Sequence, residues 1–87
     1  MLDLRIPATL PPLFPGMPRR LELDAATVQE VFDQLEERWP GFRDRVIQPG
    51  LGLRPHIHVY VNRERARLDT AIEPGARVDL ITAISGG

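Results

Sequence analysis

The residues most able to take part in chemistry stand at the end of the sequence, which reads ITAISGG. Gly86 and Gly87 follow an apolar, strand-like run, with Ser85 between the run and the glycines. Glycine has no β-carbon, so this segment could pass through a narrow channel in another protein and present the carboxylate of Gly87 there. Chain ends often contain glycine without any role, so the rest of the sequence must decide between a working tail and a frayed end.

Other reactive residue types give weaker signals. The chain has no cysteine, which excludes a disulfide, a thiolate metal site and a thiol nucleophile. His56 and His58 share one face of a predicted strand and could chelate a metal, but no third ligand is evident nearby. We therefore favour two surface histidines and expect no metal site. Arg63, Arg65 and Arg67 form a basic run, but the net charge of −1 and the lack of interleaved aromatic residues argue against nucleic-acid binding.

All eleven basic residues are arginine, so the α-amino group is the only amine in the sequence. The first residues contain Asp3, Arg5 and several prolines and lack the basic start and apolar run of a signal peptide. No stretch approaches the roughly 20 apolar residues of a membrane span. We therefore expect a cytoplasmic protein without a membrane partner.

The elements that would position the Gly-Gly segment follow from the periodicity of apolar residues. Residues 2–6 alternate in polarity and predict a half-buried strand, and residues 20–23 predict a second one. The five prolines between positions 7 and 18 form a loop, so the two strands read as a hairpin. Residues 28–39 carry an apolar stripe with helical spacing, and Pro40-Gly41 ends this helix.

Thr27 and Glu30 fit a capping box at the start of this helix, with Asp24 as a rival N-cap. Residues 42–47 could form a further helical turn, and a second loop follows at 49–55. The other side of the long helix is acidic and reads as solvated surface, although it could steer the protein toward a basic enzyme. These acidic residues are Glu30, Asp33, Glu36 and Glu37.

Residues 56–62 alternate most clearly and predict a strand, and residues 77–84 predict the last one. Between them we expect a turn at 62–64, a short irregular or helical segment that packs Leu68 and Ile72, and a turn at 73–75. The resulting order of two strands, a helix, a strand, a short piece and a strand suits one domain with a helix packed on a sheet.

This order resembles the ubiquitin-like sulfur-carrier family, which includes the small subunit of molybdopterin synthase and the carriers of thiamine and cysteine biosynthesis. The resemblance covers almost the whole chain and is most specific over VYVNRER…LDTAIEPGARVDLITAISGG, residues 59–87. Where close relatives often carry Gly or Asp after the asparagine, this chain has Arg63. The resemblance implies an α+β, β-grasp (ubiquitin-like) fold, with a mixed sheet of four to five strands on one main helix. It implies a domain over residues 1–84 and a flexible tail at 85–87.

The resemblance also implies that Gly87 is adenylated and then converted to a thiocarboxylate, while Gly86 and Ser85 thread into the partner. A carboxylate with a pKa of about 3.3–3.7 is ionised and is a poor electrophile, so it needs a leaving group. The sequence has no ATP-binding GxxxxGK[ST] loop, so an E1-like adenylating enzyme of the MoeB/ThiF kind would use the ATP. A second, sulfur-accepting enzyme would follow. The chain itself is then a carrier without bound cofactor, or a non-catalytic small subunit of a synthase, and not an enzyme.

Tyr60, Ile81 and Ala83 fall on one face of the last two predicted strands and could form an apolar patch that docks partners. The equal alternative is that they line a second small core beneath a loop. Phe14 and Met17, in the proline-rich loop, could belong to either arrangement.

Two other functions stay open from the sequence. The chain could be a ubiquitin-like modifier joined through Gly87 to lysines of target proteins, or a β-grasp interaction module with an inert tail. Without lysine it could not build lysine-linked chains of itself. The pathway that would receive the sulfur cannot be read from a scaffold shared across many pathways, which include molybdenum cofactor, thiamine and cysteine biosynthesis.

Overall fold

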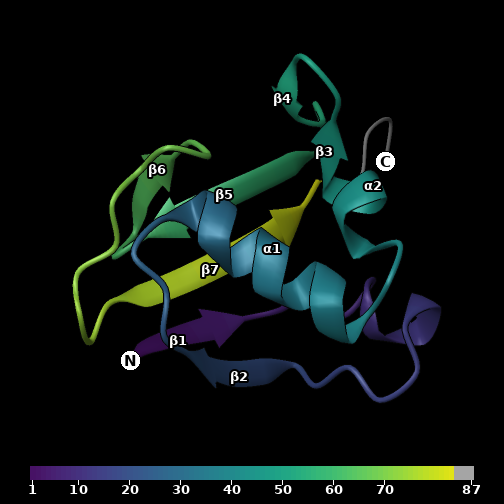
Figure 1. Cartoon of the computed structure of the whole chain (residues 1–87), viewed down its shortest axis with the longest axis horizontal. Helices are drawn as coiled ribbons and strands as arrows, with labels where there is room; N and C mark the ends of the chain where they lie inside the picture. Colours follow the sequence, from purple (N-terminus) through teal and green to yellow (C-terminus); the bar gives the residue numbers. More distant parts are fainter. Residues whose placement is uncertain (84–87) are drawn as a thin grey trace.

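One mixed sheet of five strands carries a long helix across one face in the computed structural model, which describes residues 1–83 (Figure 1). The elements are β1 (Leu2–Arg5), a 3₁₀ turn (Pro11–Leu13), β2 (Arg20–Leu23), α1 (Val28–Arg38), α2 (Phe42–Val46), β3 (Ile47–Gln48), β4 (Gly52–Leu53), β5 (Ile57–Val61), β6 (Glu64–Ala66) and β7 (Arg77–Thr82). None of the helices within residues 1–83 is long and apolar enough to cross a membrane.

The strand order is β2-β1-β7-β5-β6, so the first and last main strands of the chain are neighbours at the centre of the sheet. β1 and β7 are parallel, with Leu4 opposite Val78, and the other three pairings are antiparallel. The predicted hairpin of β1 and β2 is confirmed, as is the α+β fold with a mixed sheet on one main helix.

A single hydrophobic core lies between α1 and the sheet. The apolar stripe of α1 packs against alternate residues of β1, β5 and β7, as the two periodicities predict. The central side chains of this core are less than 3% exposed: Leu2, Leu4, Val28, Val31, Phe32, Leu35, Ile57, Val59, Val78 and Leu80.

The start of α1 has partners for its first three N–H groups. Thr27 is the N-cap, and its hydroxyl accepts from the Glu30 N–H at 3.2 Å, while the Glu30 carboxylate accepts from the Ala26 N–H. The first two N–H groups of the helix, of Val28 and Gln29, donate to carbonyls of the segment between β6 and β7. The predicted capping box is therefore confirmed, and Asp24 is not the cap.

The turn after β5 differs from the prediction. Asn62 and Arg63 alone make the turn, with φ of 49° and 71°, and Glu64 already pairs with Val61 in the edge strand β6. Two residues with positive φ are what a tight two-residue hairpin needs, and the usual second residue is glycine. Arg63 hides this signal, and β6 is three residues long without apolar alternation, so the sequence did not predict the strand.

Replacing Arg63 by glycine is expected to stabilise the fold. A side chain at φ of 71° is strained, and glycine removes that strain while losing more entropy on folding, which leaves a net gain of about 0.5–1 kcal/mol. The matched control is Arg65→Gly inside β6, which removes the same exposed side chain but should destabilise by about 0.5–1 kcal/mol. Thermal melts of both variants test this, and an unchanged or lower melting temperature for Arg63→Gly contradicts it.

Two further boundaries differ from the prediction. The loop expected at 49–55 contains the turn and the second strand of the small hairpin β3–β4, and the first strand begins at Ile47, within the expected helical turn. These two-residue strands are too short to show a period. The last strand ends at Thr82, and Ile84 lies outside the described residues. The helical turn expected at 42–47 is α2, and the segment at 67–76 is irregular and packs Leu68 and Ile72, as predicted.

Candidate functional site

The strand that leads to the predicted tail is held on both sides up to its last residues. β7 lies between β1 and β5 in the middle of the sheet. At its end, the Thr82 hydroxyl lies 2.6 Å from the Thr9 hydroxyl, and the Ala83 N–H donates to the His56 carbonyl at 2.7 Å. The body of the protein therefore fixes the position from which the remaining residues leave.

The predicted tail residues, Ser85, Gly86 and Gly87, lie outside the residues that the structure describes. Ala83 is the last described residue, and it is exposed. A hollow of about 240 Å³ opens beside it. Its lining combines apolar and polar side chains: Thr9, Leu10, Leu13, Arg45, His56, Ile57, Thr82 and Ala83.

The structure brings Tyr60 and Ile81 to the face of the sheet turned away from α1, called here the outer face. Ile81 lies opposite His58 and is 42% exposed, while Tyr60 is half-buried opposite Asp79. Ala83 follows on β7's exposed end. The predicted patch is therefore a pair of apolar side chains set among charged and polar ones.

The alternative of a second small core is wrong for the described residues. Phe14 and Met17 are buried in the single core, where the Phe14 ring lies 5.8 Å from the Phe42 ring. The proline-rich loop thus folds toward α2 and leaves the outer face uncovered. Tyr60 and Ile81 remain available to another molecule.

The outer face also holds a charged network that sequence reasoning missed. The Asp3 carboxylate accepts from Arg5 at 3.0 and 3.2 Å and from Arg20 at 2.9 Å. These bonds hold the pKa of Asp3 below its usual value, and the bond from Arg5 has the largest effect. Arg77 donates to both oxygens of Asp79 in the same way, at 3.2 and 3.0 Å. The alternation of β1 and β2 indicated charged outward positions, but not that β7 would join them.

The acidic side of α1 is largely occupied within the protein. Glu36 accepts from the Arg43 N–H at 2.8 Å and the Gly41 N–H at 3.1 Å, and these bonds lower its pKa. Asp33 forms an ion pair with the Arg43 guanidinium at 2.8 Å. Glu30 caps the start of α1. Of the four acidic residues, only Glu37 therefore lacks an intramolecular partner among residues 1–83. These carboxylates stabilise the corner between α1 and α2.

The two histidines do not form part of a larger cluster. Within residues 1–83, no group of three or more histidine, aspartate or glutamate side chains is placed to hold a metal ion. His56 is exposed at the entrance to β5, and His58 is half-buried on the outer face.

Comparison with known proteins identifies this arrangement. The model of the ThiS family matches residues 13–87. Small archaeal modifier protein 3 of Haloferax volcanii is 37% identical over 68 residues, which are 74% of this chain and 73% of that protein.

Solved structures match almost the whole chain and confirm the predicted β-grasp fold. A chain of the Amycolatopsis orientalis BexX/CysO complex superposes with a TM-score of 0.87 at 28% identity, and the match covers 100% of both chains. CysO of Mycobacterium tuberculosis gives a TM-score of 0.83 at 27% identity, covering 97% of this chain and all of that one. SAMP1 of Haloferax volcanii gives 0.75 at 30% identity over 99% and 98% of the two chains.

Proposed function

The chain belongs to the ThiS family of ubiquitin-like sulfur carriers, and from this premise we propose that it carries sulfur as a thiocarboxylate on Gly87. Members of this family are small carrier and modifier proteins and not catalysts. The observation that carries the proposal is that the family match runs through Gly87 and includes β7, the strand that leads to it. Ser85 and Gly86 then form the thread between the domain and the reacting carboxyl group.

The chemistry takes two displacement steps on the Gly87 carboxylate. A carboxylate oxygen attacks the α-phosphorus of an ATP held by a partner enzyme, the bond to the β-phosphate breaks, and pyrophosphate leaves. A donor at the oxidation level of sulfide then attacks the acyl carbon, the bond to AMP breaks, and AMP leaves. The thiocarboxylate sulfur is later delivered to an acceptor bound by a second enzyme. The partner must exclude water, because an exposed acyl-adenylate hydrolyses.

Support for a dedicated partner comes from one of the solved structures. The Amycolatopsis orientalis chain that superposes on this one was solved in a BexX/CysO complex. The fixed end of β7 suits such an encounter, since it delivers residues 84–87 from a defined point. We propose an E1-like adenylating enzyme of the MoeB/ThiF kind as the first partner, with ATP used there and no cofactor held by this chain.

Intact-mass measurement tests the proposal. The purified chain is incubated with the adenylating enzyme of its own organism, ATP and a sulfide donor. The expected product is heavier by the replacement of one oxygen atom with one sulfur atom, and the change maps to the peptide that contains Gly87. Omitting ATP is the control. A chain whose mass stays unchanged in the complete mixture contradicts the proposal.

A second candidate function is protein modification through Gly87. It is favoured by the 37% identity to a protein named Small archaeal modifier protein 3 and by the likeness to SAMP1. Both functions share the adenylation step and differ in the nucleophile that follows. Covalent adducts on lysines of other proteins, formed with ATP but without a sulfide donor, would establish modification. Trimming Gly86 and Gly87 must abolish these adducts.

Half-buried Tyr60 and exposed Ile81, both on the outer face, should contribute to partner binding. Tyr60→Asp and Ile81→Asp are each expected to raise the KM of the carrier in adenylation about ten-fold, because each places a charge in a surface that the partner would cover. Leu51→Asp is the matched control, since Leu51 is 75% exposed on the turn between β3 and β4. Melting curves should show that all three variants fold, with a lower melting temperature for Tyr60→Asp, because Tyr60 is half-buried and the new carboxylate would lie opposite Asp79. Unaltered kinetics for both outer-face variants would remove Tyr60 and Ile81 from the docking surface.

A further inference from the structure

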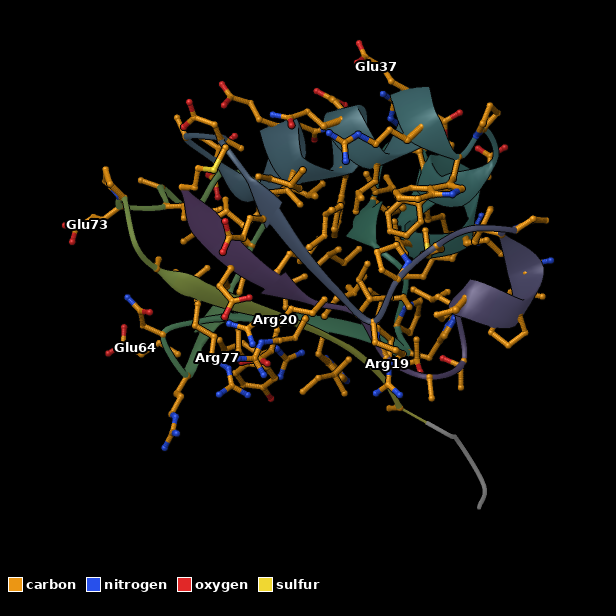
Figure 2. All side chains as sticks on the ribbon, turned by 90° about the horizontal axis from the view of Figure 1, so that it is seen from below. Arg19, Arg20, Glu37, Glu64, Glu73 and Arg77 are labelled. Atoms are coloured by element: carbon orange, nitrogen blue, oxygen red, sulfur yellow. The ribbon has the colours of Figure 1, made fainter. Side chains whose placement is uncertain are left out.

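An arginine-lined hollow of about 450 Å³ runs along the outer face of the sheet to Thr82 at the end of β7, called here the root of the tail. Arg5, Arg19, Arg20 and Arg77 line it, and its far end is formed by residues 80–82 of β7. In Figure 2, Arg19, Arg20 and Arg77 gather on the side away from α1, whereas Glu37 lies on the opposite side of the molecule. The hollow and the point where the chain leaves the domain are therefore one continuous surface.

Three of these arginines are held by their Nε atoms. Arg19 Nε donates to the Ile6 carbonyl at 2.8 Å, Arg20 Nε to Asp3 at 2.9 Å, and Arg77 Nε to Asp79 at 3.0 Å. Their terminal Nη atoms make no hydrogen bond or ion pair within residues 1–83. A guanidinium fixed in this way keeps a planar edge with free donors, and this edge matches a carboxylate in fork geometry at low entropic cost.

The acidic partners of these arginines lie deeper in the surface than the arginines do. The Asp3 side chain is 25% exposed against 63% for Arg20, and Asp79 is 18% exposed against 44% for Arg77. An approaching molecule therefore meets guanidinium groups first. The ionised carboxylates beneath them act as anchors, which is consistent with the lowered pKa of Asp3.

Charge is divided unevenly between this surface and the rest of the protein. The hollow and its anchors hold four arginines and two aspartates, which leaves seven arginines and ten acidic residues elsewhere in the chain. The hollow and its anchors are thus positive on a molecule whose remaining residues are together negative, although Glu22 lies on the same face opposite Asp3. Such a distribution orients the protein in the field of an acidic partner and speeds correct encounter.

On these grounds we propose that Arg19, Arg20 and Arg77 form an arginine clamp that binds aspartate and glutamate side chains of the enzyme that activates the tail. The inference rests on the proposed function and names the chemistry of the partner surface. A protein is the occupant because the same surface exposes Ile81 beside the hollow and continues to the root of the tail. A ligand that offered only negative charge would bind the arginines but would leave the exposed Ile81 side chain uncovered.

Charge reversal in the full-length chain tests the clamp. The double variant Arg20→Glu/Arg77→Glu is expected to raise the KM for adenylation by the cognate enzyme at least about ten-fold, with kcat within about two-fold of wild type. Rising ionic strength should raise the wild-type KM and have little effect on that of the variant. The double variant Arg38→Glu/Arg63→Glu reverses two exposed arginines that do not line the hollow, and it supplies the control for net charge.

The outcomes separate the two claims. If wild type is adenylated and Arg20→Glu/Arg77→Glu has the same KM as the net-charge control, the clamp is wrong and the carrier function stands. If wild type is not adenylated at all, both are wrong. Melting curves show whether the double variant folds, and Arg19→Glu provides a second test, since Arg19 is tied only to a backbone carbonyl and not to a carboxylate.

Crosslinking provides a direct test of acidic contact, because the chain contains no lysine. Arg20→Lys keeps the positive charge and introduces the only side-chain amine. A carbodiimide then joins this amine to a carboxylate in direct contact. The expected result is a crosslinked peptide pair that contains position 20 and an aspartate or glutamate of the adenylating enzyme, while Arg38→Lys gives none. Equal crosslinking of both variants, or none at position 20, overturns the clamp.

Discussion

Adding one alanine after Gly87 is expected to lower the rate of adenylation at least about 100-fold, because a misplacement of even 1 Å at a reacting group can cost that much. The extra residue moves the carboxylate by about 3.3–3.6 Å along an extended chain. It also places a β-carbon where the proposed channel accommodates only glycine. Pyrophosphate release with the adenylating enzyme and ATP measures the rate directly.

Matched variants separate position from side-chain size in this experiment. One alanine added before Met1 changes the length equally and should leave the rate unchanged. Gly87→Ala keeps the length and adds only the methyl group, so a large loss there identifies steric exclusion. If the chain with the added C-terminal alanine is adenylated at the wild-type rate, Gly87 is not the point of attachment.

Phe42→Ala is expected to lower the free energy of unfolding by about 3–5 kcal/mol, as large-to-small changes at buried aromatic sites do. Phe42 is fully buried, and its ring lies 5.8 Å from the rings of both Phe14 and Phe32. One side chain thus joins α2, the proline-rich loop and α1. For a domain of this size the melting temperature should fall by more than about 12 °C.

Urea titration of Phe42→Ala and of Leu51→Ala provides the comparison. Leu51 is 75% exposed, so its truncation should change the free energy of unfolding by less than about 0.5 kcal/mol. A loss at Phe42 no larger than at Leu51 would mean that the aromatic cluster does not hold these three segments together.

The sequence predicted the elements whose side chains follow a clear period. Alternation at Leu2 and Leu4 and helical spacing from Val28 to Leu35 come directly from burial on one face, so local pattern was sufficient. The edge strand β6 was missed because it is short and charged and because Arg63 occupies a position that usually holds glycine. The hairpin β3–β4 was missed because two-residue strands have no measurable period.

The candidate site could be predicted only in part. The alternation of β5 and β7 placed Tyr60 and Ile81 on one face correctly, and family resemblance indicated the role of Gly87, which stays a prediction. The arginine hollow depends on which strands are neighbours, since Asp3, Arg20 and Arg77 are distant in sequence and meet only in the order β2-β1-β7. Local pattern contains no information on that order. The partners of Asp33 and Glu36 were missed for another reason, since they depend on how α2 folds back against the end of α1.

Under the proposed function, the central position of β7 would link folding to the activation of Gly87. Without it, β1–β2 and β5–β6 are two separate hairpins, and β7 joins them by pairing with β1 on one side and β5 on the other. This strand leaves the ribosome last of the described elements, so the sheet closes only after β7 has been synthesised. An incomplete or misfolded copy then lacks a rigid base from which to offer its end. The activating enzyme would therefore adenylate only copies whose sheet is complete, and only these copies would receive sulfur.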